Sequence, residues 1–226
     1  MLGAGNCNDL DLRQLSAGFA SVSLVDLDRE ALEEAVERQH ASGVIRLIAP
    51  FDLSGVLDTL DSEPNAILHR LGEPAPVDVP GGPFDVVASC CVLTQMFQSI
   101  EDAGLATVEP ILALRRRHLR QLWDLTRAGG AFVLATDVVS TTTAPDLNDI
   151  SEPMLGRRLE RLIEQRNFFT GANPAAIWQE LLDEFVPEGA VPVSHDPWMW
   201  PLVQSHSYLT WAVTVRRPSV NLPKPA

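Results

Sequence analysis

The alternation of short apolar runs with amphipathic stretches constrains the fold of this 226-residue chain more than any other feature. Apolar runs rich in β-branched residues occupy positions 21–25, 44–49, 84–90 and 131–135. Between them, apolar residues recur at helical spacing, most clearly over residues 109–126 and more weakly over residues 56–71. Asp9 is predicted to cap a short helix that continues to residue 17. Strands that alternate with helices are typical of βαβ units, whose strands pair in parallel. The first 137 residues therefore predict an α/β fold.

After Asp137 the pattern changes to polar segments and longer helical stretches. Two further helices are predicted, one over residues 152–166 and one from residue 173 onward. Two closing strands are predicted over residues 197–200 and 207–215. We therefore expect a single domain over residues 1–226, with a helical insertion at about 138–190 and a frayed tail at about 217–226.

The charge of the chain argues against a nucleic-acid partner. Thirty acidic residues outnumber 17 basic ones, and the net charge is −13. Such a surface repels phosphate backbones, whose neutralisation supplies most nucleic-acid affinity. The one basic run, residues 115–120, is interpreted as a solvated helix face. No apolar run reaches the roughly 18 residues of a membrane span, and no secretory signal or disulfide framework is visible. A cytoplasmic location is expected.

A glycine pair stands where the first predicted strand turns into a helix. Gly3 and Gly5 allow a sharp turn and a close approach of the backbone to a ligand, although a simple tight turn would also explain them. Asp26 ends the second predicted strand, where a carboxylate can accept hydrogen bonds from a ribose. Asp28 is better placed to cap the helix that follows. Together these residues favour a nucleotide-type site.

Five segments in this order resemble the motifs of class I S-adenosylmethionine-dependent methyltransferases. They are LGAGNCND, LVDLD, IAPFDL, FDVVASCCVLTQM and RAGGAFVLATD. The resemblance covers residues 1–137 and the two closing strands. It implies a Rossmann-like, mostly parallel seven-stranded sheet with helices on both faces and an antiparallel closing strand. It also implies that the cofactor is S-adenosylmethionine and that the reaction is methyl transfer, with a small molecule as the expected acceptor.

The resemblance further implies a set of residues that contact this cofactor. The methionine part is expected to lie along Gly3, Ala4 and Gly5. Asp26 is expected to hold the ribose, with Leu27 packed on the adenine. The remaining expected contacts are Asp52 at the exocyclic amine, Leu53 beside the ring, Ser89 and Cys90 at a strand end, and Gln95 near the methionine end or the substrate. Two alternatives stay open: Asp52 as the cap of a helix near Ser54, and Gln95 as an exposed loop residue.

No catalytic residue or metal ligand is predicted. Cys90 and Cys91 are interpreted as buried structural thiols. The histidines lack metal-ligand spacing, and the adjacent pair His195 and Asp196 is a weak candidate for a base and its orienting group. Methyl transfer needs mainly alignment and exclusion of water, so it does not require a catalytic triad. Phe168 and Phe169, in the insertion, are candidates to cover an acceptor pocket.

Two other functions stay open. An NAD(P)-dependent oxidoreductase would normally have a third glycine where this chain has Asn8. The other alternative is a methyltransferase-like domain that binds without catalysis. Because only Met1 and Leu2 precede the turn at Gly3, we also expect that the natural chain begins further upstream, with an apolar stretch that completes the first strand.

Overall fold

The structure is a computed structural model that describes residues 1–41, 43–60, 64–105, 107–203 and 206–219. Its strands are β1 (Val22–Val25), β2 (Ile45–Ile48), β3 (Phe84–Cys90), β4 (Thr126–Ser140), β5 (Val191–Ser194), β6 (Trp198–Val203) and β7 (His206–Arg216). β1 pairs with β2 in parallel, and β3 pairs with β4 in parallel. β7 runs antiparallel to β4, and both β5 and β6 pair with β7 in antiparallel orientation.

A single residue, Leu2, joins the two-stranded sheet to the five-stranded one. Leu2 forms parallel bridges with Val25 of β1 and with Ser89 of β3. Its backbone N–H donates to the Ala88 carbonyl at 2.7 Å. The Met1 amino group, next to Leu2, donates a hydrogen bond to the Ser23 carbonyl of β1 at 2.8 Å. Burial lowers the pKa of this amino group to about 6. Leu2 thus stands where the resemblance places the first strand, and the upstream extension stays a prediction.

The predicted seven-stranded, mostly parallel sheet is wrong in two respects. The structure contains a five-stranded mixed sheet and a two-stranded sheet, because only Leu2 pairs between β1 and β3. The pairings of β7 with β4, β5 and β6 are all antiparallel. Only two residues connect β6 to β7, and so short a connection allows only antiparallel pairing. The antiparallel orientation of the closing strand is confirmed.

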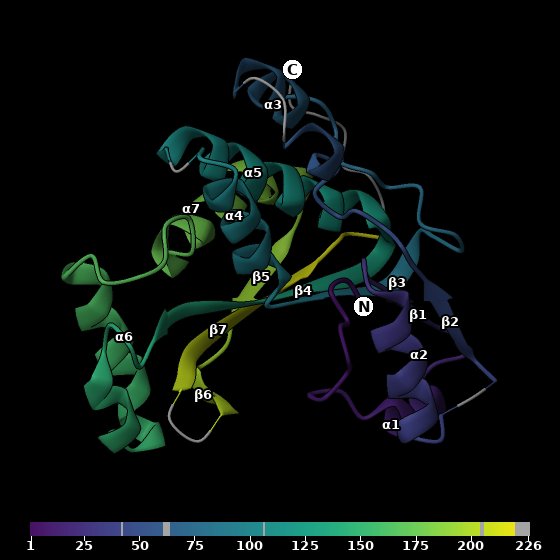
Figure 1. Cartoon of the computed structure of the whole chain (residues 1–226), viewed down its shortest axis with the longest axis horizontal. Helices are drawn as coiled ribbons and strands as arrows, with labels where there is room; N and C mark the ends of the chain where they lie inside the picture. Colours follow the sequence, from purple (N-terminus) through teal and green to yellow (C-terminus); the bar gives the residue numbers. More distant parts are fainter. Residues whose placement is uncertain (42, 61–63, 106, 204–205, 220–226) are drawn as a thin grey trace.

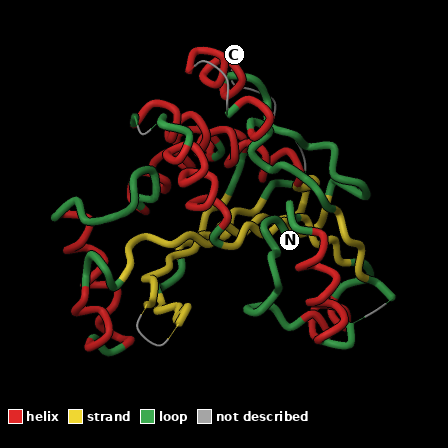
Figure 2. Tube along the Cα trace, viewed as in Figure 1, coloured by secondary structure: helices red, strands yellow, loops and turns green. Residues whose placement is uncertain are grey.

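Helices cover both faces of the sheet, as predicted (Figures 1 and 2). They are α1 (Leu12–Gly18), α2 (Arg29–Arg38), α3 (Pro64–Leu71), α4 (Val92–Asp102), α5 (Val108–Leu125), α6 (Leu155–Glu164) and α7 (Pro174–Glu184). α1 and α2 pack with β1 and β2 around Leu24 and Leu32, which are fully buried. α4 and α5 lie on the opposite face, over a larger core that includes Leu122 and Phe132. None of these described helices is long and apolar enough to cross a membrane.

Local side-chain hydrogen bonds fix where the first helices begin. Asp28 caps α2 by accepting from the Ala31 N–H, as predicted. The predicted cap of α1 at Asp9 is wrong, because Asp11 holds that position and accepts from the Gln14 N–H. The predicted helix over residues 56–71 is present only in part, as a 3₁₀ turn at Leu57–Thr59 and as α3, and residues 61–63 lie outside the described part.

Helix α4 and strand β5 are absent from the sequence-based expectations. Gln95 lies on α4, so the alternative of an exposed loop residue is right about its exposure and wrong about the loop. Apolar residues recur at helical spacing there, and five of them are buried: Val92, Leu93, Met96, Phe97 and Ile100. α4 covers the carboxyl ends of β3 and β4, and this places Gln95 next to the glycine turn.

The insertion between β4 and β5 is held against α5 by ion pairs. Arg115 and Arg116 of α5 both pair with Glu180 of α7, at 2.7 and 3.0 Å. Arg120 pairs with Glu184 and with Glu188. The interpretation of residues 115–120 as a solvated face is therefore wrong, since Arg115 is only 6 % exposed. These arginines dock the insertion on the core.

Candidate functional site

Three cavities with shared lining residues lie at the carboxyl ends of β1, β3 and β4. The β1/β2 cavity, of about 110 Å³, is lined by Gly3, Asp26, Leu27, Asp52 and Leu53, among others. The glycine-loop cavity, of about 460 Å³, is lined by residues 3–10, Cys90, Cys91, Trp200 and others. The aromatic cavity, of about 550 Å³, includes Phe168, Phe169 and Asp137. Gln95 lines all three cavities. This edge is where open α/β sheets bind ligands.

The glycine turn needs its two glycines for different reasons. Gly3 has a φ of +66°, and a Cβ there would lie 2.5 Å from the Val92 Cβ, so only glycine lets the turn pack on α4. Gly5 has a φ of +50°, and a Cβ there would meet no atom within 4 Å. Because Gly5 lines the glycine-loop cavity, its missing side chain leaves backbone accessible to a ligand.

Asp26 ties the end of β1 to the glycine turn. Its Oδ2 accepts a hydrogen bond from the Gly5 N–H at 2.7 Å, and its Oδ1 accepts from the Asp28 N–H at 3.1 Å. A carboxylate offers about four acceptor sites, so both oxygens retain capacity for ligand hydroxyls. Asp26 therefore lines the β1/β2 cavity while Asp28 caps α2, as the sequence predicts.

Asp52 lines the same cavity but also has a structural task. Its Oδ1 accepts from the Ser54 N–H and hydroxyl, at 2.8 and 2.6 Å. Its Oδ2 accepts at 2.9 Å from the N–H of Leu57, the first residue of the 3₁₀ turn. Within the described residues 43–60 no α-helix begins near Ser54, so the capping alternative is present only as this bond to the first residue of the 3₁₀ turn, whose N-cap position is Val56. Beside it, Leu27 is 51 % exposed and offers an apolar surface to a flat ring, whereas Leu53 is buried.

The residues at the end of β3 divide between the core and the cavities. Cys90 lines the glycine-loop cavity, whereas Ser89 lines none of the three cavities among the residues described. The Ser89 hydroxyl instead lies 2.8 Å from Nε2 of His118 on α5. Burial raises the pKa of the Cys90 and Cys91 thiols, so both stay protonated near neutrality. This favours the structural interpretation of the two thiols.

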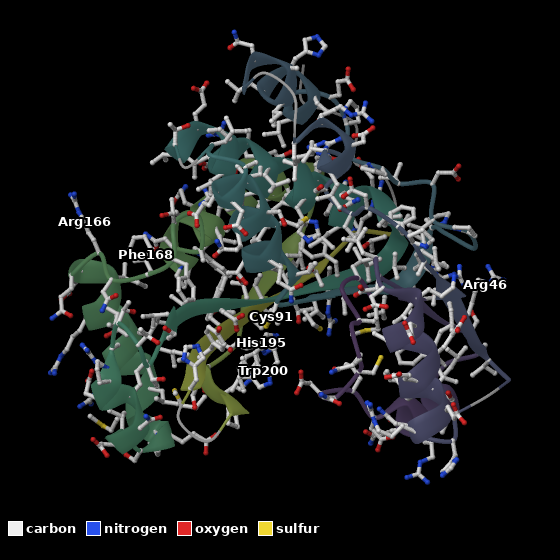
Figure 3. All side chains as sticks on the ribbon, in the orientation of Figure 1. Arg46, Cys91, Arg166, Phe168, His195 and Trp200 are labelled. Atoms are coloured by element: carbon white, nitrogen blue, oxygen red, sulfur yellow. The ribbon has the colours of Figure 1, made fainter. Side chains whose placement is uncertain are left out.

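Two further residues of the site, Trp200 and Asp137, are not among the sequence-based candidates. Trp200 of β6 lines both the glycine-loop and the aromatic cavity, and its Nε1 donates to Asp9 Oδ1 at 3.0 Å. Asp137 lines the aromatic cavity next to an irregularity in the pairing of β4 with β7. Such bulges re-aim side chains beside active sites. In Figure 3, Cys91 and Trp200 lie near the middle of the molecule, and Phe168 lies nearer to α6 and α7.

Other sequence candidates lie away from these cavities. His195 is exposed, and its Nε2 lies 2.7 Å from the Thr214 hydroxyl on β7. Neither His195 nor Asp196 lines the three cavities in the described structure. Within the described ranges, His, Cys, Asp and Glu side chains form no group of three or more that is placed to hold a metal ion.

Comparisons with known proteins return structures only, since no family model and no curated protein matches the sequence. An O-methyltransferase family protein from Burkholderia thailandensis is 11 % identical, with a TM-score of 0.44 over 96 % of this chain and 50 % of the other. An arsenic(III) S-adenosylmethionine methyltransferase from Chlamydomonas reinhardtii is 16 % identical, with a TM-score of 0.44 over 97 % and 62 %. The S-adenosylmethionine-dependent methyltransferase SibL is 14 % identical, with a TM-score of 0.39 over 96 % and 49 %. This chain thus spans about half to three-fifths of the length of these proteins.

Proposed function

We propose that this chain binds S-adenosylmethionine and transfers its methyl group to a small molecule. The observation that carries the proposal is the adjacency of the β1/β2 and glycine-loop cavities, which share Gly3 and Gln95. One cavity offers a carboxylate and an exposed apolar side chain, and the other offers bare backbone at Gly5. Two adjacent cavities with these linings suit an elongated ligand with a ribose, a flat ring and a polar tail.

In this arrangement the β1/β2 cavity holds the adenosine part. Asp26 accepts hydrogen bonds from the ribose hydroxyls, while its bond to the Gly5 N–H keeps the turn in place. Leu27 covers one face of the base. Asp52 accepts from the exocyclic amine through the acceptor capacity that its capping bonds leave free.

The glycine-loop cavity suits the positively charged part of the cofactor. Its described lining contains Asp9 and the rings of Trp198 and Trp200, and no basic side chain. Aromatic faces attract cations, and a carboxylate adds to that attraction. When bound, S-adenosylmethionine supplies a methyl group already activated by its sulfonium. The chain's own residues therefore need only align an acceptor and exclude water.

The aromatic cavity is the proposed acceptor site. It shares Gln95, Trp200 and Leu202 with the glycine-loop cavity, so its occupant lies beside the methionine end. Phe168 and Phe169 contribute rings from the insertion. We therefore assign acceptor selection to this cavity and cofactor binding to the other two.

Calorimetric titration with S-adenosylhomocysteine and with NADH tests the proposal. We expect the first to bind and the second not to bind. Gly5→Val should abolish binding by filling the glycine-loop cavity. Gly104→Val is the matched control, because Gly104 has a φ of +79° and equally open surroundings but lies outside the three cavities. Binding of NADH alone would favour the oxidoreductase, and binding without turnover on any acceptor would favour a non-catalytic domain.

A further inference from the structure

The aromatic cavity has a lining that discriminates by charge. Its described residues include five aromatic rings, those of Phe97, Phe168, Phe169, Trp200 and Tyr208. They also include two carboxylates, Glu101 and Asp137, and no arginine, lysine or histidine. A volume of about 550 Å³ lies in the usual range for small-molecule pockets. Aromatic faces and carboxylates both attract cations and repel anions.

Asp137 is the better placed of the two carboxylates. It is only 6 % exposed. Its Oδ1 accepts from the Thr210 hydroxyl at 3.1 Å and from the Cys91 thiol at 3.3 Å. Its Oδ2 lies 3.4 Å from the Thr94 hydroxyl, which also lies 3.2 Å from the Cys91 carbonyl. Oδ2 therefore has at most this one long contact, and it retains capacity to accept from a ligand.

Among the residues that the structure describes, those that line the aromatic cavity with Asp137 include no arginine, lysine or histidine to compensate its charge. Burial raises the pKa of Asp137, although its hydrogen-bond donors act in the opposite direction. The Cys91 thiol and Asp9 face it, and Glu101 is in the same cavity. The pKa of Tyr208 is also raised, by burial and by the charge of Asp137. His206 packs edge-on against the Tyr208 ring with centroids 4.9 Å apart. A buried carboxylate in such surroundings is stabilised by a cationic ligand.

We propose, on the basis of the proposed function, that the aromatic cavity binds a ring-bearing amine as acceptor, with its ammonium group paired to Asp137. The rings of Phe168, Phe169 and Trp200 contact the ring of the ligand, and the carboxylate fixes its nitrogen. An ammonium group has no free electron pair with which to accept a methyl group. Transfer of its proton to Asp137 Oδ2 leaves both groups neutral and frees the nitrogen lone pair.

Calorimetry with three matched probes tests the assignment. 2-Phenylethylamine, 2-phenylethanol and 3-phenylpropionate share a ring and a two-carbon linker and differ in charge. On protein saturated with S-adenosylhomocysteine, we expect the amine to bind at least 10-fold more tightly than the alcohol, and the carboxylate more weakly than both. Asp137→Asn should lower the affinity for the amine at least 10-fold and change that for the alcohol less than three-fold. Asp85→Asn is the control, because Asp85 is exposed and is the second residue of β3, at the opposite edge of the sheet.

The outcomes separate this inference from the proposed function. A carboxylate probe that binds as tightly as the amine overturns the assignment, as does a set of three probes that all fail to bind. If folded Asp137→Asn protein still prefers the amine, Asp137 does not bind the ammonium group, and that part of the assignment is wrong. The wild-type comparison needs no variant, so it decides even if Asp137→Asn does not fold. If S-adenosylhomocysteine itself does not bind, the proposed function fails, and the charge preference of the cavity is then measured on the free protein.

Discussion

The indole N–H of Trp200 donates a hydrogen bond to Asp9 Oδ1 at 3.0 Å, across 191 positions of sequence. This contact ties β6 to the loop that follows the glycine turn. The Trp200 ring lines both the glycine-loop and the aromatic cavity. The position of one side chain thus shapes the proposed cofactor site and the proposed acceptor site together.

Trp200→Phe should weaken cofactor binding while the protein stays folded. The variant keeps an aromatic ring but loses the donor to Asp9. The bond is already present in the free protein, so most of its roughly 1.5–3 kcal/mol acts on stability. Because the ring also lines the glycine-loop cavity, the dissociation constant for S-adenosylhomocysteine should still rise, by up to about 10-fold. Trp178→Phe, on α7 and outside the three cavities, is the control for loss of an indole. Equal affinities of the two variants would show that the contact has no part in binding.

The two aspartates at the end of β1 should separate affinity from stability. Asp26→Ala removes the acceptor for the Gly5 N–H and for the ribose, so the dissociation constant for S-adenosylhomocysteine should rise roughly 10-fold or more. Asp28→Ala removes the cap of α2 and should cost about 1 kcal/mol of unfolding free energy with little change in affinity. Calorimetry and urea unfolding measure the two quantities. A loss of affinity confined to Asp28→Ala would reverse the assignment.

The sequence predicts a strand correctly where its own residues, and the residues that flank it, mark where it begins and ends. β3 begins and ends at Phe84 and Cys90, as expected, because its apolar run is short and bounded by a loop rich in proline and glycine. β5 was missed because its pairing with β7 is a long-range contact and its four residues include Pro192. The number of strands is wrong at Leu2, because one residue pairs there with both neighbours where the resemblance implies a whole strand.

The sequence predicts a residue of the candidate site correctly where its position at the end of a strand is enough to place it. Asp26 follows a strand directly, and the carboxyl ends of parallel strands meet at one edge. Ser89 and Cys90 were predicted together, but successive side chains of a strand point to opposite faces, so Ser89 points into the core toward His118. Asp137 acquires its place from the irregular register of β4, which no local pattern reveals.

Phe168 and Phe169 should control the acceptor more than the cofactor. Both rings line the aromatic cavity and neither lines the other two in the described structure. Replacing either with alanine should change turnover across a panel of small-molecule acceptors and leave the affinity for S-adenosylhomocysteine within a few-fold. Mass spectrometry of methylated products and calorimetry measure these effects. Equal loss of both properties would assign the rings to the core, against which both are packed.

The two glycines of the turn should differ in their cost of substitution. Gly5→Ala places a Cβ in open space and should cost only the left-handed strain, about 1 kcal/mol. Gly3→Ala adds a clash with Val92 on α4, worth a further ~1–3 kcal/mol. Urea unfolding of both variants measures the difference. Adding Val92→Gly, which removes the Cβ that lies 2.5 Å away, should recover part of the loss in Gly3→Ala but none in Gly5→Ala. Additive costs in this cycle would exclude the clash.

His118 should make the protein less stable in mild acid. Gln121 donates through its Nε2 to the carbonyls of Leu53 and Pro76, so its Oε1 is the atom that faces His118. This oxygen accepts a hydrogen bond from His118 Nδ1. The other ring nitrogen, Nε2, then accepts from the Ser89 hydroxyl, so His118 is neutral in this network. Burial lowers the pKa of His118 from 6.5 to about 4, so as the pH falls the unfolded chain binds a proton before the folded one. The stabilisation by neutral His118 is complete above pH 6.5 and is lost between pH 6.5 and 4, in total about 3 kcal/mol of unfolding free energy.

Urea unfolding at pH 7.5, 5.5 and 4.5 measures this loss. The variant His118→Gln cannot titrate at this position, so its unfolding free energy should decline less over the same pH range. Parallel declines in the two proteins would mean that His118 does not cause the acid sensitivity.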